Sequence, residues 1–86
     1  MQIEGAVIKE QGVTFAVVIV KRHVIQSSHT ATEAIRSFGS LFPGMPVILM
    51  AQDGHGVPTY YGRRDIINFM ASVPIEAISW KRYTFS

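Results

Sequence analysis

The sequence has no cysteine, few charged residues and no apolar run long enough to span a bilayer. Without cysteine there are no disulfides, no thiolate zinc sites and no cysteine nucleophiles. A small domain that folds without disulfides suits a reducing compartment, so we expect a cytoplasmic location. The longest apolar stretch, residues 13–20, is too short for a membrane span and does not stand where a signal peptide would. We therefore expect a soluble protein with no membrane partner.

Charged residues make up only 16% of the 86 residues, whereas hydrophobic residues make up 48%. The usual charged share is about 25%, so the surface is short of charge. A chain of this length forms a single domain, residues 1–86, with one core. Because apolar interfaces resemble cores, the composition predicts a homodimer. The net charge of +2 permits attraction to phosphates without requiring it.

The apolar periodicity predicts five strands and two helices. Residues 10–12 read as the turn of a first hairpin, and Asp53-Gly54 is a strong signal for a second one. Thr30 and Glu33 have the spacing of a capping box at a helix start. The predicted strands cover residues 3–9, 13–20 with an extension to 25, 45–51, 57–61 and 76–85, and the predicted helices cover about 30–42 and 64–72.

The element order ββαββαβ predicts an α+β fold with a mostly antiparallel sheet of about five strands. Each helix has a single apolar stripe, which favours both helices packing on one face of the sheet. Residues 13–20 are nevertheless apolar on both strand faces. Since no helix remains to cover the opposite face, we expect a partner subunit to cover it.

The stretch TYYGRRD, residues 59–65, is the most distinctive candidate site. Two arginines at a helix start oppose the helix dipole unless an anion, or a carboxylate such as Glu10 or Glu76, offsets them. An anion-binding site would use Tyr60, Tyr61, Arg63 and Arg64. The plainer interpretation is a bend in which Gly62 ends a strand, the two tyrosines point to opposite faces and Asp65 favours the dipole.

Lys81 and Arg82 form a further basic spot, as do residues 21–23. If these clusters lay beside Arg63 and Arg64, the positive surface and the nearby aromatic rings would suit a single-stranded nucleic acid. The alternative is that the basic residues are solvated strand ends and the rings belong to the core. The low net charge favours this second interpretation.

His23 and His55 are weaker candidates, as acids or bases of a small enzyme or ligand-binding dimer that holds an anionic substrate with Arg63 or Arg64. No HExxH spacing and no G-x-S-x-G elbow occurs, so we expect no metal, no cofactor and no recognisable catalytic motif. The function predicted first is a non-enzymatic binding or interaction module with an anion-attracting patch at residues 60–65. An anionic ligand or a nucleic acid is its expected partner class.

Overall fold

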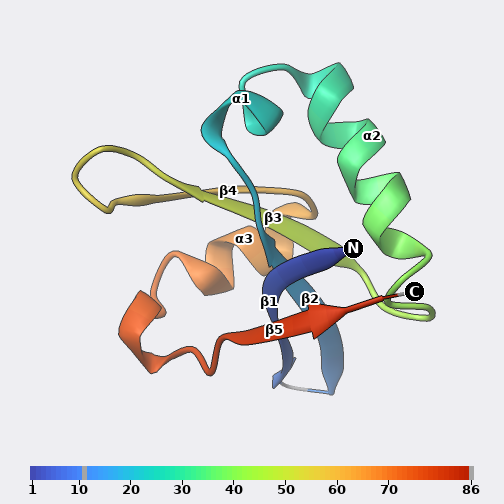
Figure 1. Ribbon diagram of the computed structural model, residues 1–86. Helices are drawn as coiled ribbons and strands as arrows, with labels where there is room; N and C mark the ends of the chain where they lie inside the picture. The colour runs from blue at the N-terminus through green and yellow to red at the C-terminus, as the bar shows by residue number, and fades with distance from the viewer. Residues whose placement is uncertain (11, 86) are drawn as a thin grey trace.

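The computed structural model describes residues 1–10 and 12–85; Gln11, in the first predicted turn, lies outside the described residues. Five strands form one mixed sheet in the order β4-β3-β2-β1-β5 (Figure 1). All neighbouring pairs are antiparallel except β2 and β3. The prediction of a mostly antiparallel five-stranded sheet is therefore confirmed, with a parallel pair at its centre. The strands are β1 Gln2–Glu10, β2 Val13–Ile19, β3 Val47–Gln52, β4 Pro58–Tyr61 and β5 Lys81–Thr84.

Four helical segments join the strands of the described chain, so the observed order differs from the predicted ββαββαβ. Two helices follow the first pair of strands, and a helix and a 3-10 turn follow the second pair. They are α1 Arg22–Ile25, α2 Ser28–Gly39, α3 Arg64–Met70 and the 3-10 turn η1 Ile75–Ala77. Residues 22–25 were expected to extend a strand and are instead helical. The physical reason is the parallel pairing of β2 with β3, because the chain must leave the sheet and cross over it. Within the described chain, none of the helices has the length and apolar character needed to cross a membrane.

The start of α2 also differs from the prediction. Ser27 is the N-cap, with extended backbone angles, and its Oγ accepts a hydrogen bond from the Thr30 N–H at 3.5 Å. Thr30 already lies inside the helix, so it cannot form the predicted capping box with Glu33. The Glu33 carboxylate instead accepts a hydrogen bond from Arg36 at 3.4 Å.

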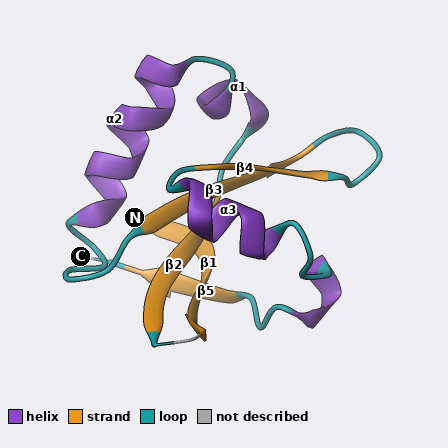
Figure 2. Ribbon diagram, turned by 180° about the vertical axis from the view of Figure 1, so that it is seen from behind, coloured by secondary structure: helices purple, strands orange, loops and turns teal. Residues whose placement is uncertain are grey.

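The two longer helices pack on opposite faces of the sheet, so the prediction that both lie on one face is wrong. Figure 1 shows α1 and α2 together on one side, and the reverse view in Figure 2 brings α3 to the front of the strands. Phe15, Val17, Ile48 and Met50 form the core with α3, and the alternate residues of β2 and β3 form a second core with α2. The helix α3 thus supplies the cover that we expected from a partner subunit.

The central strands are buried on both faces because each contributes alternate side chains to the two cores. We call the two surfaces of the sheet the α2 face and the α3 face, after the helix that covers each. The buried residues of the core on the α2 face are Ala16, Val18, Ala31, Phe42, Val47 and Leu49. The continuous apolar runs of β2 and β3 therefore follow from a sheet layer between two helical layers.

Candidate functional site

The two tyrosines of TYYGRRD lie on opposite faces of the sheet. Tyr60 packs against the core on the α3 face, and Tyr61 packs against the core on the α2 face. The rings are separated by the sheet and do not form a joint stacking platform. The Tyr60 hydroxyl is buried without a hydrogen-bond partner among the described residues, and burial raises its pKa.

Gly62 makes the bend between β4 and α3. Its φ of 148° lies in the region that favours glycine. A Cβ atom at this position would come within 2.6 Å of the Ile48 Cδ1 atom on β3. The bend therefore needs glycine both for its backbone conformation and for the close approach of the chain to β3.

Arg63 is paired within its own segment. Its Nε donates to one carboxylate oxygen of Asp65 at 2.8 Å, and its Nη2 donates to the other at 2.7 Å. Both hydrogen bonds are charge-assisted and together form a bidentate fork. The fork from Arg63 holds the pKa of Asp65 at about 2, and the same contact raises the pKa of Arg63. The carboxylate that offsets Arg63 is thus Asp65, rather than Glu10 or Glu76.

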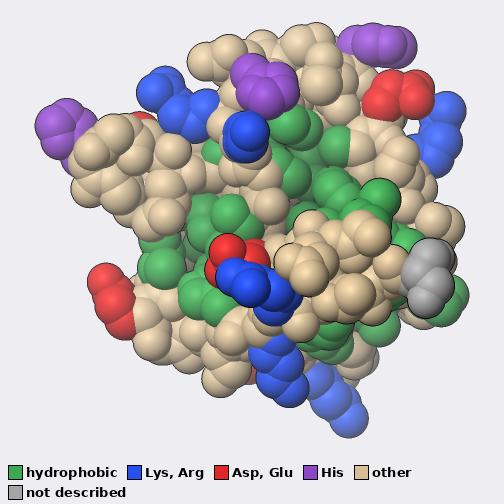
Figure 3. Space-filling model, viewed as in Figure 1, with side chains coloured by type: hydrophobic (Ala, Val, Ile, Leu, Met, Phe, Trp, Pro, Cys, Tyr) green, Lys and Arg blue, Asp and Glu red, His purple; other side chains and the backbone are tan. Residues whose placement is uncertain are grey.

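The other predicted basic residues are not brought to this place. Arg64 is exposed, and among residues 1–10 and 12–85 it belongs to neither ion pair. Lys81 and Arg82 lie on β5, at the opposite edge of the sheet from β4, with three strands between the two edges. At a strand spacing of about 4.8 Å the two edges are about 19 Å apart. Figure 3 shows the Lys and Arg side chains in several separate groups on the face in view.

The three histidines are exposed, and none of their rings forms a hydrogen bond with another described residue. His55 contacts Asp53 only through its backbone N–H, which donates to the Asp53 carboxylate at 2.7 Å. Backbone N–H groups of Val57 and His55 hold the pKa of Asp53 below its usual range. Within the described chain, no three His, Asp or Glu side chains gather as metal ligands would. Among the described residues, His23 and His55 therefore have no hydrogen-bonded acid or base partner.

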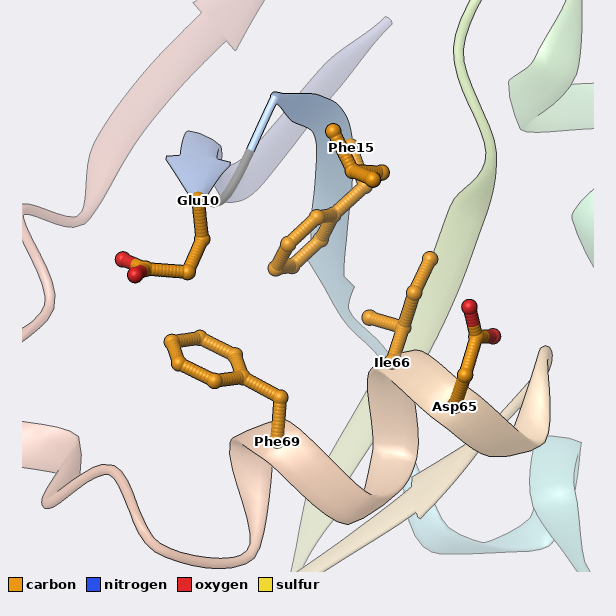
Figure 4. A pocket seen from close by; sticks show the side chains of 6 residues that line it. Glu10, Phe15, Asp65, Ile66 and Phe69 are labelled. Carbon is orange, nitrogen blue, oxygen red and sulfur yellow. The ribbon is translucent and has the colours of Figure 1, made fainter.

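The structure contains a cavity that the sequence did not indicate. It has a volume of about 170 Å³ and lies between α3 and the hairpin of β1 and β2. The rings of Phe15 and Phe69 meet edge to face, with centroids 6.3 Å apart. Figure 4 shows Glu10 at the margin of this space, with its carboxylate turned away from the Phe15 ring, and Asp65 on the far side of Ile66. We call this space the α3 cavity; its lining residues are Glu10, Val13, Phe15, Asp65, Ile66 and Phe69.

A groove of about 290 Å³ adjoins the α3 cavity. It shares Glu10 and Phe69 with the cavity and continues between β1 and the segment from Val73 to Ser79. Trp80 follows this segment, and its indole N–H donates to the carbonyl of Ile75 at 3.3 Å. Glu10 and Phe69 thus lie between the cavity and the groove and line both.

The α3 cavity has the chemistry of a site for a positively charged ligand. Its lining holds two aromatic rings and two carboxylates but no lysine or arginine. Asp65 is already bound by Arg63, whereas Glu10 belongs to neither of the ion pairs of the described residues. A cation with an apolar body could contact the rings through its body and the Glu10 carboxylate through its charge.

Sequence reasoning missed Glu10 and Phe15 as site residues because they lie far from α3 along the chain. Only the register of the first hairpin and the packing of α3 bring them to Phe69. Comparisons of the chain with protein-family models, with curated proteins and with solved structures found no match. The functional argument therefore depends on the geometry alone.

Proposed function

We propose that this protein is a non-enzymatic binding module whose α3 cavity takes a small organic cation with an apolar body. The observation that carries the proposal is that Glu10, which belongs to neither ion pair of the described residues, lines the same cavity as the Phe15 and Phe69 rings. A cavity of about 150 Å³ holds a benzene ring. The α3 cavity, at about 170 Å³, is thus large enough for a single-ring ligand.

The test uses 2-phenylethylamine, which is a cation at neutral pH, and 2-phenylethanol, its neutral analogue of similar size. Each is titrated into the labelled protein while amide chemical shifts are followed. We expect the amine to move the signals of Val13, Ile66 and Phe69 and to bind more tightly than the alcohol. Equal binding of both compounds would contradict a cation site, and binding of neither would contradict the cavity as a site.

Substitution of Glu10 tests whether its charge contributes to amine binding independently of the shape of the cavity. Glu10→Gln keeps the size of the side chain, and we expect it to weaken amine binding by about tenfold while the alcohol is unaffected. The matched control is Glu33→Gln, because Glu33 is exposed on α2 at the other face of the sheet. Unchanged amine affinity in Glu10→Gln would show that Glu10 does not bind the ammonium group.

Arg64 supports a second candidate, an anion-binding version of the module. It is exposed next to Arg63 and belongs to neither ion pair of the described residues. Arg64→Ala should weaken the binding of heparin at low salt, whereas Arg63→Ala should have a smaller effect because Arg63 is held by Asp65. Arg36→Ala, on α2, is the control of equal charge. Binding that is identical in all of these variants would reject the patch.

The homodimer remains part of the proposal, but only one of the two arguments made from the sequence still supports it. The uncovered sheet face no longer supports it, because α3 covers that face. What supports it is the low share of charged residues together with the free edges of the sheet. Exposed strand edges present unpaired backbone groups that can pair with another chain.

A further inference from the structure

The two edges of the sheet differ in their capacity to accept another strand. In an antiparallel pair, every second residue exchanges backbone hydrogen bonds with its partner and the others point outward. In the second hairpin the Asp53 N–H donates to the Val57 carbonyl, so Val57 directs its backbone groups toward β3. Counting on in twos, Thr59 and Tyr61 also direct their backbone groups toward β3. Pro58 and Tyr60 therefore point their backbone groups outward from β4. Since proline has no N–H, the β4 edge is partly blocked.

The β5 edge is not blocked in this way. Met1 and Phe85 exchange backbone hydrogen bonds of 3.0 and 2.8 Å, so they form a bonded pair. The alternation then makes Tyr83 bond inward to Ile3. The backbone N–H and C=O groups of Arg82 and Thr84 consequently point away from β1, toward the free edge.

We infer that a second copy of this chain adds its β5 to this edge in antiparallel orientation, an arrangement that rests on the proposed homodimer. The outward-pointing residues must face each other, which restricts the symmetric registers. A register centred on Arg82 would place two guanidinium groups directly opposite each other, which is unfavourable. A register centred on Tyr83 pairs Arg82 with the partner's Thr84, and Thr84 with the partner's Arg82. Among the registers that pair described residues alone, only the one centred on Tyr83 uses both outward-pointing residues of each copy, and it forms four backbone hydrogen bonds. A register centred on Thr84 would pair Arg82 with position 86, which lies outside the described residues.

The side chains fit the register centred on Tyr83. Tyr83 meets the partner's Tyr83 in a close cross-strand pair, and Phe85 meets the partner's Lys81, which permits a cation–π contact. Tyr83 already packs edge to face on Phe42, with ring centroids 5.4 Å apart, so its ring is positioned on the α2 face. Glu4 is the direct neighbour of Arg82 on β1, although the two belong to neither ion pair of the described residues. The dimer would be one continuous sheet across the two-fold axis.

The pairing joins short strands, so the interface is small and the association is expected to be weak and reversible. Sedimentation equilibrium over a wide range of concentration tests it. Thr84→Pro removes an outward donor without removing a bond to β1, and we expect it to weaken self-association by about tenfold or more. Thr84→Val is the matched control, because it keeps the N–H and should dimerise like the wild type. Circular dichroism checks that both variants are folded.

The outcomes separate the inference from the proposals on which it rests. A wild type that stays monomeric at every concentration overturns both the homodimer and the β5 pairing but leaves the amine titration unaffected. A Thr84→Pro variant that dimerises like the wild type overturns the β5 pairing alone. If Thr84→Pro does not fold, amide hydrogen exchange in the wild type decides. We expect the amides of Arg82 and Thr84 to gain protection as concentration rises, and no gain would overturn the pairing.

Discussion

The ion pair between Arg63 and Asp65 makes a direct prediction about one carboxyl group. The Arg63 fork favours the charged form of Asp65 and lowers its pKa to about 2. A lowered pKa in the folded state means that the pair stabilises the fold above the unfolded value of about 3.9. This contribution is lost as the pH falls from there through about 2. We expect Arg63→Gln to raise the pKa of Asp65 toward about 3.9, as measured by carbon NMR of the carboxyl group.

Asp53 is the internal control for this titration. Its pKa is lowered by backbone N–H groups of Val57 and His55, with only a smaller part from Arg22, and Arg63 makes no contribution. The Asp53 titration should therefore be the same in the wild type and in Arg63→Gln. A pKa of Asp65 that does not move in the variant would show that the fork does not persist in solution.

At the scale of elements, the junction between β4 and α3 depends on Gly62. Gly62→Ala would place a methyl group 2.6 Å from the Ile48 Cδ1 atom at a φ of 148°. We expect a loss of about 1–3 kcal/mol in the free energy of unfolding, measured with urea. Gly39→Ala is the opposite control, because Gly39 is the last residue of α2 and a Cβ atom added there would meet no atom of another part of the chain within 4 Å. Its substitution should raise the free energy of unfolding by about 0.5–1 kcal/mol. Equal effects would contradict the strain assigned to Gly62.

The elements that the sequence predicted well are those with strong local signals. The apolar runs of β2 and β3 and the turn at Asp53 gave correct strands and a correct hairpin. The placement of the helices was not predictable in the same way, because an apolar stripe shows that a helix has a buried side but not which sheet face it covers. That choice follows from the crossover between β2 and β3, which takes α1 and α2 to one face.

The candidate site was predictable only in part, for the same reason. TYYGRRD was correctly singled out as a bend followed by a helix. The partner of Arg63, however, lies two residues away, at a spacing outside the usual helical pairs. The α3 cavity depends on long-range packing of Phe15 against Phe69, for which no local pattern exists.

At the scale of the whole molecule, the two cores share the strands β2 and β3, so they should unfold together. Trp80, the one tryptophan of the chain, packs on the α3 face and reports on that core. Phe42 is buried in the core of the α2 face. If the strands couple the cores, Phe42→Leu should lower the free energy of unfolding measured by Trp80 fluorescence by about 1–2 kcal/mol. This effect is expected although Phe42 and Trp80 lie on opposite faces of the sheet.

Urea unfolding followed by Trp80 fluorescence and by far-ultraviolet circular dichroism measures this coupling. We expect the two signals to give one coincident transition in the wild type and again, at lower urea, in Phe42→Leu. A fluorescence transition that stays in place while the circular dichroism shifts would mean that the α2 layer unfolds by itself. In that case α3 and the strands would keep the α3 cavity intact without α2. A coincident shift instead means that a destabilising substitution in either core reduces the population of the folded site.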